Sequence, residues 1–124
     1  MKPDQIKEGM RWLLQAEQDL DDAKYVFRGK RFHLACFLAQ QAAEKALKAF
    51  LYANGETRVF GHSVAELCRR AISYDKEFEK VKKVSVLDKY QDIQMDCREE
   101  SLMRFSMKLM LRGRLNWLRK WSNS

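Results

Sequence analysis

Residues that interrupt helices are scarce in this chain of 124 residues, which contains one proline and five glycines. Proline lacks a backbone donor and glycine gives the backbone extra freedom, so both tend to end helices. With so few of them, the sequence has few places where a helix must stop. At this length we expect one domain spanning residues 1–124, which is large enough to build its own core.

Cysteine is also sparse, and its pattern argues against two common ways of stabilising a small domain. Cys36, Cys68 and Cys97 lie far apart and show no CxxC or Cys/His ligand spacing. The sequence therefore supports neither a disulfide framework nor a zinc site, and we expect no metal and no cofactor. The thiols point to a reducing, cytoplasmic setting.

Long apolar runs are missing as well. No segment approaches the roughly 20 apolar residues that a membrane span requires, and no signal-type segment opens the sequence. We therefore expect no membrane among the partners of this protein. The net charge of +7 allows contact with phosphate, nucleotide or nucleic acid, but it also simply keeps a small domain soluble. Both interpretations stay open.

The stretch from Phe32 to Gly55 is the one around which the rest is organised. Its alanines and large apolar residues recur at three- and four-residue steps, with no proline or glycine before Gly55. This pattern predicts one long central helix, covered on several sides by its neighbours. Its apolar surface is interrupted by polar residues, which form either a solvated stripe or part of a site. They are Gln40, Gln41, Glu44, Lys45 and Lys48.

Residues 4–28 predict an amphipathic helix that stops at Gly29. The turn after it is short, so this helix must fold back against residues 32–54 as an antiparallel hairpin. Three acidic side chains diverge around the first helix, which favours a solvated face over a catalytic acid pair. They are Asp19, Asp21 and Asp22.

Two cap residues predict where the next helices begin. Ser63 precedes a short apolar-periodic segment, and Glu66 three residues later completes a capping box. Asp75 is a plausible N-cap for a fourth helix within residues 74–90, whose apolar residues recur at steps of three. The lysines of that segment are more typical of a solvated face than of nucleic-acid recognition, because exposed aromatics do not alternate with them.

The last segment, residues 91–124, differs in composition and holds four of the six methionines and two of the three tryptophans. It predicts a final helix that closes the bundle, although Gly113 weakens it and Arg114 falls on its apolar stripe. A basic amphipathic helix lying on anionic lipid or against a partner is the alternative. The stripe comprises Met103, Met107, Met110, Leu111, Leu118 and Trp121.

These patterns together predict an all-α fold, an antiparallel up-and-down bundle of about five helices. Three parts of the sequence then resemble the HEPN domain family over residues 12–90: the string AQQAAEKALKA, the GHSV of residues 61–64 and the LDKY of residues 87–90. Further matching residues precede the first string: Trp12, Ala16, Asp19, Leu20 and Ala23.

The resemblance implies a small helical bundle, often dimeric and frequently encoded beside a minimal nucleotidyltransferase, with ribonucleases and toxins among its branches. The GHS element fits the nucleotidyltransferase-associated branch, where it would suit contact with nucleotide or phosphate. Arg58 and His62 are the candidate catalytic residues, since metal-independent RNA cleavage needs a proton-transfer group and a cation. Only three residues separate them, fewer than separate Arg and His in the family's ribonucleases.

Three functions remain open at this stage. The first is a module that binds nucleotide or polynucleotide and acts with a minimal nucleotidyltransferase in a toxin–antitoxin-like system. The second is a metal-independent ribonuclease, and the third is a structural homodimer that recruits proteins. We expect a homodimer in each case, because apolar positions such as Phe32, Phe37 and Phe60 exceed what one core absorbs. The candidate phosphate-binding residues are Arg58, His62, Ser63, Lys45 and Lys48.

The sequence departs from the family directly after LDKY. Related proteins typically continue with an RYPD segment, a Pro- and Gly-rich loop, a PYE-like segment and an acidic closing helix. Codons can be chosen for residues 90–108 so that a shifted frame reads PRYPDGLPGRIPYEVFNE, which contains the first three features in that order. Beyond it the same shift permits an Ala- and Glu-rich helix. We therefore predict that residues 91–124 are the product of a frameshift, and that their apolar stripe replaces the lost helix in packing.

Overall fold

The computed structural model describes residues 3–59, 63–79 and 101–123. These form α1 (Pro3–Arg28), α2 (Phe32–Ala53), α3 (Val64–Ile72), the 3-10 helix η1 (Lys76–Phe78) and α5 (Ser101–Ser122). No strand occurs within these ranges. The all-α helical bundle expected from the sequence is confirmed.

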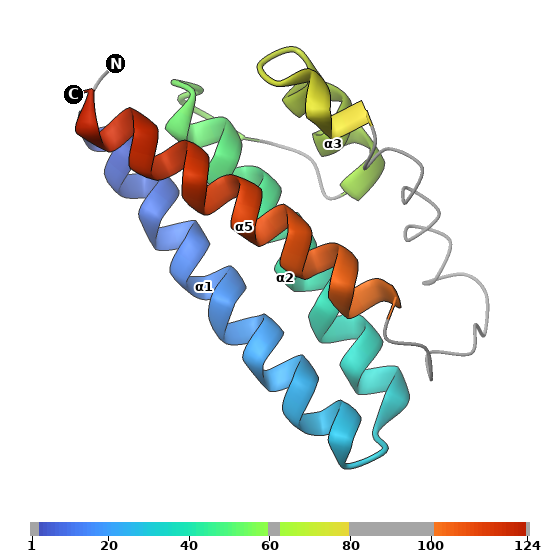
Figure 1. The fold of residues 1–124 in the computed structure, drawn as a ribbon. Helices are drawn as coiled ribbons and strands as arrows, with labels where there is room; N and C mark the ends of the chain where they lie inside the picture. The colour runs from blue at the N-terminus through green and yellow to red at the C-terminus, as the bar shows by residue number, and fades with distance from the viewer. Residues whose placement is uncertain (1–2, 60–62, 80–100, 124) are drawn as a thin grey trace.

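Three long helices lie side by side, and α3 packs on the far end of α2 (Figure 1). The first two form the predicted antiparallel hairpin. α1 ends because Lys30 adopts a left-handed φ of 63°, while the Lys30 amide donates to the Phe27 carbonyl and the Arg31 amide to the Val26 carbonyl. α5 then runs beside both helices of the hairpin, so the start of α1 and the end of α5 lie at the same end of the bundle (Figure 1).

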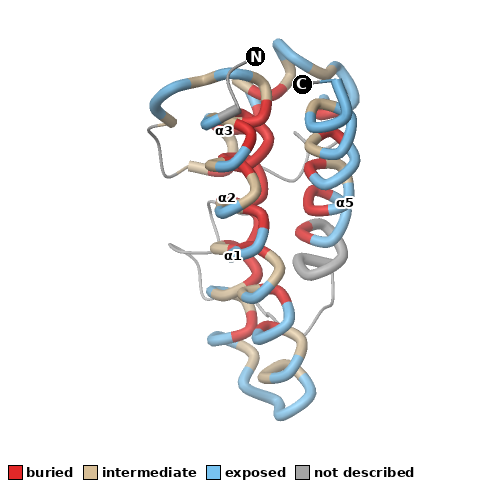
Figure 2. Tube along the Cα trace, turned by 90° about the vertical axis from the view of Figure 1, so that its left-hand side faces the viewer, coloured by how far each residue is buried: buried red, intermediate tan, exposed pale blue. Residues whose placement is uncertain are grey.

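The core follows the alanine face of α2, which is almost continuously buried (Figure 2). Small side chains let the neighbouring helices come close enough to touch the backbone of α2. Ser106 on α5 donates to the Ala39 carbonyl at 2.7 Å, and a Cβ atom added to Gly9 on α1 would lie 2.9 Å from the carbonyl oxygen of Ala49. α2 is therefore the central helix of the bundle.

The prediction that this apolar stripe of α5 faces the bundle is wrong, because the helix is rotated so that most of the stripe points to solvent. Of the members whose burial the structure describes, Met107, Leu111, Leu118 and Trp121 are exposed to solvent and Met110 is buried. The Met103 side chain lies outside the described part. A narrower face of α5 points into the bundle instead, and it carries mainly small and polar residues together with two large apolar ones. Further large side chains do not fit there because the closely packed α1–α2 pair leaves little room. This face comprises Ser106, Leu109, Met110, Gly113 and Asn116.

The fourth predicted helix begins where expected, but its described part is short. The Asp75 side chain accepts a hydrogen bond from the Glu77 amide at 3.0 Å, which starts η1, and Phe78 is buried against Phe50. The rest of the predicted helix lies outside the described residues. No helix in the described ranges has the length and apolar character needed to cross a membrane.

Candidate functional site

The polar stripe on α2 is largely buried, and its two lysines are paired with carboxylates. The Lys45 ammonium lies 2.7 Å from Asp19 on α1, and the Lys48 ammonium lies 3.2 Å from Glu44, one turn earlier on α2. The Lys48 and Glu44 side chains each retain 11% of their exposure. The interpretation of this stripe as solvated is therefore wrong for this pair.

Aromatic side chains complete the surroundings of Lys48. Its ammonium lies 5.0 Å from the centre of the Trp12 ring, close enough for a cation–π interaction. Trp12 in turn stacks on Tyr52, with the ring centres 6.4 Å apart and the planes 10° apart. The indole N–H of Trp12 is buried and has no hydrogen-bond partner among the described residues. A buried donor of this kind is rare in folded proteins and marks a place where a ligand, a water or a rearrangement can satisfy it.

The segment after α2 is tied down beside these aromatics. Gly55 takes a φ of 99°, which glycine adopts without strain, and the Glu56 amide donates to the Leu51 carbonyl at 3.2 Å. The Glu56 carboxylate is paired with Arg70 of α3. Farther on, the Val59 amide donates to the Tyr52 hydroxyl at 3.4 Å. The described backbone that follows α2, residues 54–59, is therefore held at Glu56 and at Val59.

Arg58 lies on this anchored segment and is exposed. Its neighbour Val59 is bonded to Tyr52, which follows Lys48 by one helical turn on α2. The structure therefore brings Arg58 to the same end of α2 as Lys48. Lys45 lies a further turn away, held by Asp19. We call the surface formed by Trp12, Lys45, Lys48, Tyr52 and Arg58 the α2 face.

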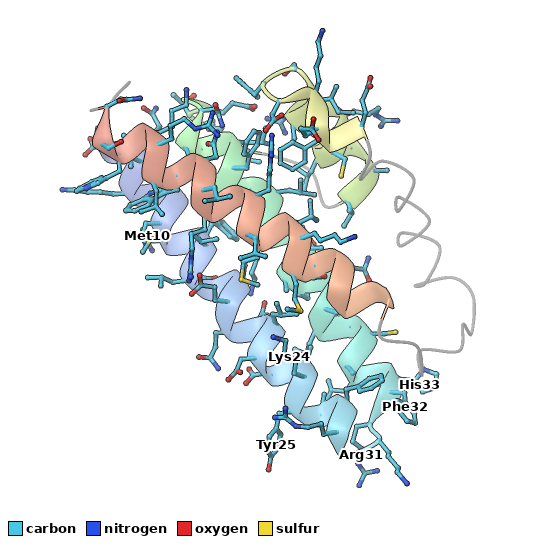
Figure 3. The ribbon with its side chains drawn as sticks, in the orientation of Figure 1. Met10, Lys24, Tyr25, Arg31, Phe32 and His33 are labelled. Carbon is cyan, nitrogen blue, oxygen red and sulfur yellow. The ribbon has the colours of Figure 1, made fainter. Side chains whose placement is uncertain are left out.

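Ser63 has the structural role predicted for it. Its hydroxyl accepts a hydrogen bond from the Glu66 amide at 3.2 Å and so caps α3. His62 lies outside the described residues, so its position relative to Arg58 stays a prediction. The other histidine, His33, is exposed beside Arg31 and Phe32 at the turn of the hairpin, at the opposite end from α3 (Figure 3).

The described residues hold no group of three or more His, Cys, Asp or Glu side chains that would bind a metal ion. Cys68 is a buried free thiol, whereas Cys36 is disulfide-bonded. The expectation that no disulfide would form is wrong for Cys36. The described side chains of the α2 face offer charge, hydrogen-bonding groups and aromatic surface.

Two comparisons with known proteins bear on this fold. A model of the HEPN domain matches residues 10–98, well over half of the chain. The chain belongs to the HEPN domain family. The crystal structure of an archaeal HEPN homologue superposes with a TM-score of 0.55 at 27% sequence identity, covering 93% of this chain and 96% of that one. No curated protein matches the sequence.

Spacing in the sequence predicted two local features of this part of the HEPN fold. The cap at Ser63 and the position of Lys48 one turn after Glu44 followed from spacing alone. The aromatic part was missed, because a tryptophan at helical spacing is equally typical of a core. The four-residue steps from Glu44 to Lys48 and from Lys48 to Tyr52 were the signal that these side chains share one face.

Proposed function

We propose that this HEPN protein binds the phosphates of a nucleotide or polynucleotide at the α2 face, and that it acts with a minimal nucleotidyltransferase in a toxin–antitoxin-like system. Membership of the family supports a nucleotide- or RNA-related role in general. The observation that carries the specific site is the exposed Arg58 on a segment held by the Tyr52 and Arg70 side chains. Because the backbone of this segment is held, only the Arg58 side chain has to be ordered when it binds an anion.

The lysines of the α2 face contribute less than the sequence suggested. Each is paired with a carboxylate, so a phosphate gains little from Lys45 or Lys48 unless it displaces Asp19 or Glu44. Arginine presents a fork of donors that matches phosphate oxygens. Arg58 is accordingly the residue expected to dominate, with Trp12 and Tyr52 offering aromatic surface beside it.

Titration of the purified protein with ATP, GTP and a short single-stranded RNA tests this proposal. Affinity should fall between about 50 mM and about 200 mM salt, because bound phosphates release counterions. Arg58→Ala should weaken binding about ten- to a hundredfold, the loss expected for one charge-assisted hydrogen-bonding group. Arg69→Ala is the matched control, since Arg69 is exposed on α3 at the end away from Ser63.

Two results would overturn the proposed site: no binding of any of the three ligands, or equal losses for Arg58→Ala and Arg69→Ala. The same samples distinguish binding from catalysis. RNA that is shortened in the presence of a chelator, but not by His62→Ala, would identify a metal-independent ribonuclease. Intact RNA with salt-sensitive binding supports the binding module.

The nucleotidyltransferase partner has its own test. We expect the gene to lie beside one for a minimal nucleotidyltransferase, and the two proteins to purify as a complex after co-expression. If no such gene lies nearby and the protein forms no complex with a nucleotidyltransferase, the partner is wrong even if phosphate binding is confirmed.

A further inference from the structure

Positive charge gathers where α1 turns into α2, at the end of the bundle opposite α3. Residues 23–43 contain no Asp or Glu, whereas a lysine, two arginines and a histidine fall within residues 28–33 and are exposed. An exposed tyrosine lies one turn before them on α1. We call these five residues the hairpin tip: Tyr25, Arg28, Lys30, Arg31 and His33.

The cations of the hairpin tip are not used by the fold. None of them forms an ion pair with a carboxylate in the described ranges, where other cations make the salt bridges. Lys24, just before the tip, is a different case, because it lines a groove together with Glu17 and Asp21. The charge at the tip itself is therefore available to a ligand.

The backbone that carries these side chains is fixed. The Gly29 amide donates to the Tyr25 carbonyl at 3.2 Å, which adds to the two amide bonds that end α1. Phe27 and Phe32 pack edge to face across the turn, with ring centres 5.4 Å apart. A ligand at the hairpin tip therefore has to order side chains only, which lowers the entropy lost on binding.

Tyr25 places an aromatic face beside the cations. It retains 72% of its exposure, the highest fraction among the large apolar side chains in the described part of the chain. Its side chain and that of Arg31 point away from the bundle (Figure 3). Arg28 follows Tyr25 by three residues, so the two are neighbours on the surface of α1. Cations next to an exposed aromatic are the pattern that binds single strands, in which phosphates meet the charges and a base stacks on the ring.

The order of charge and apolar surface argues against a membrane. Lys30 and Arg31 form the extreme end of the hairpin, in the connection between the helices. The exposed Tyr25, Leu34 and Phe37 are set back from this end, within α1 and α2. Their insertion among acyl chains would carry the two charges deeper still, where a charge is costly.

The cations also come from three different parts of the hairpin. Arg28 ends α1, Lys30 lies in the turn, and His33 lies in the first turn of α2. They are therefore spread across the end of the bundle rather than gathered on one element. This arrangement suits the successive phosphates of a chain better than one isolated phosphate.

We propose that the hairpin tip binds single-stranded nucleic acid, with phosphates on Arg28, Lys30 and Arg31 and one base stacked on Tyr25. Contacts to phosphates and to the face of a base do not involve the 2′-hydroxyl, so RNA and DNA strands should bind alike. The tip precedes residues 91–124 and is unaffected by the predicted frameshift.

This surface does not depend on the α2 face. Phe32, at the tip, and Tyr52, at the α2 face, are about 30 Å apart along α2 at 1.5 Å per residue. A mononucleotide bound at the α2 face does not reach the tip. Binding of ATP or GTP therefore reports on one surface, and tip variants report on the other.

Fluorescence anisotropy with labelled oligo-uridine and oligo-thymidine strands of equal length tests the cations. Arg28→Gln/Arg31→Gln should weaken binding of both strands about three- to thirtyfold, the loss expected for two exposed charge pairs. The slope of log affinity against log salt should become shallower by about 1.4, because two fewer phosphates are neutralised. Lys7→Gln/Arg69→Gln is the matched control, since it removes the same charge from exposed positions far from the tip, and it should leave both quantities unchanged.

The stacked base has a separate test. Tyr25→Ala should weaken binding of both strands about five- to a hundredfold, whereas Tyr25→Phe, which keeps the ring, should bind as the wild type does. A strand of the same length that lacks bases should bind the wild type and Tyr25→Ala equally. Circular dichroism checks that all variants remain helical.

Several results would overturn this proposal: no binding of either strand, equal losses for the two double variants, or strand binding that is insensitive to Tyr25→Ala. Binding of phosphatidylserine vesicles through Arg28 and Arg31, without binding of strands, would overturn it in favour of a membrane. Strand binding that is lost in the tip variants while ATP and GTP still bind supports it. If Arg58→Ala has no effect but the tip variants do, the α2 face is wrong and the hairpin tip stands.

Discussion

Two glycines inside helices meet different surroundings, and the difference predicts opposite effects of the same substitution. A Cβ atom at Gly9 would lie 2.9 Å from the Ala49 carbonyl oxygen and 3.3 Å from the Ala53 nitrogen, both backbone atoms that cannot move aside easily. At Gly113 the nearest atom is the Ala46 carbonyl oxygen at 3.6 Å, an ordinary contact. Of these two glycines, only Gly9 lacks room for a Cβ atom.

We expect Gly9→Ala to lower the free energy of unfolding by about 1–3 kcal/mol, since α1 must move away from α2. Gly113→Ala should raise it by about 0.5–1 kcal/mol, because alanine favours the helix and fits the space. Urea denaturation followed by circular dichroism measures both. A stabilising Gly9→Ala, or a strongly destabilising Gly113→Ala, would contradict the packing described for α2.

Asp75 links η1 to α5 and makes stability depend on pH. Burial by itself raises the pKa of this carboxyl, but hydrogen bonds from the Glu77 amide and Arg112, with the charges of Arg112 and Arg119, outweigh it. The net pKa lies below the ordinary value of 3.8. The unfolded chain therefore takes up the proton first as the pH falls, so the stabilisation is present above about pH 4 and is lost below it.

Asp75→Asn keeps a side-chain acceptor for the cap and removes the charge. The wild-type protein should be more stable than this variant at pH 7, and the difference should shrink as the pH falls below about 4. Thermal unfolding at pH 7, 5 and 3 measures it. Glu79→Gln, at an exposed position just after η1, is the control, and a difference that stays constant with pH would contradict the assigned role.

At the scale of the helix, α5 shows why large apolar residues are an unreliable guide to a buried face. Where two helices with large side chains pack together, large apolar residues fill the gap between the two backbones. Against the alanine surface of α2 the gap is narrow, and the residues that fit are Ser106, Gly113 and Asn116, with hydrogen bonds satisfying the polar ones. The helical period of α5 could be predicted from the sequence, but its rotation depends on the neighbouring surface.

The hairpin and the starts of α3 and η1 were predictable because every local signal agreed with the structure. Periodicity, the stops near Gly29 and Gly55 and the caps at Ser63 and Asp75 all act within a few residues. The α2 face could not be predicted from local signals alone. Its lysines were found by spacing, but Asp19 is 26 residues from Lys45, and a pair at that separation depends on how two helices are rotated against each other.

The rotation of α5 gives a direct prediction. Leu109→Ala should lower the free energy of unfolding by about 2–4 kcal/mol, because Leu109 is 2% exposed and its removal leaves a cavity. Leu115→Ala should cost less than about 0.5 kcal/mol in the monomer, since Leu115 is 60% exposed. Urea denaturation at low protein concentration compares them. A larger loss of unfolding free energy for Leu115→Ala than for Leu109→Ala would contradict the face of α5 assigned to the core.

At the scale of the whole molecule, the origin of the last segment remains a prediction. α5 packs against α1 and α2 within the same chain, so residues 101–122 act as a helix of the bundle whatever their origin. We expect the DNA around codon 90 to contain a site where a single insertion or deletion opens a frame encoding RYPD. Sequencing that region tests the predicted frameshift. The prediction is wrong if no single insertion or deletion there opens this frame.

The hydrogen bonds that join α5 to the hairpin span most of the chain, and this governs the order of folding. The bond from Ser106 to Ala39 connects positions 67 apart, and the bond from Trp117 to Ile6 connects positions 111 apart. Contacts across the short α1–α2 turn are local and form faster. During synthesis the hairpin can therefore form on the ribosome before α5 exists. In that interval the alanine face of α2 is open, and newly made chains are most exposed to aggregation.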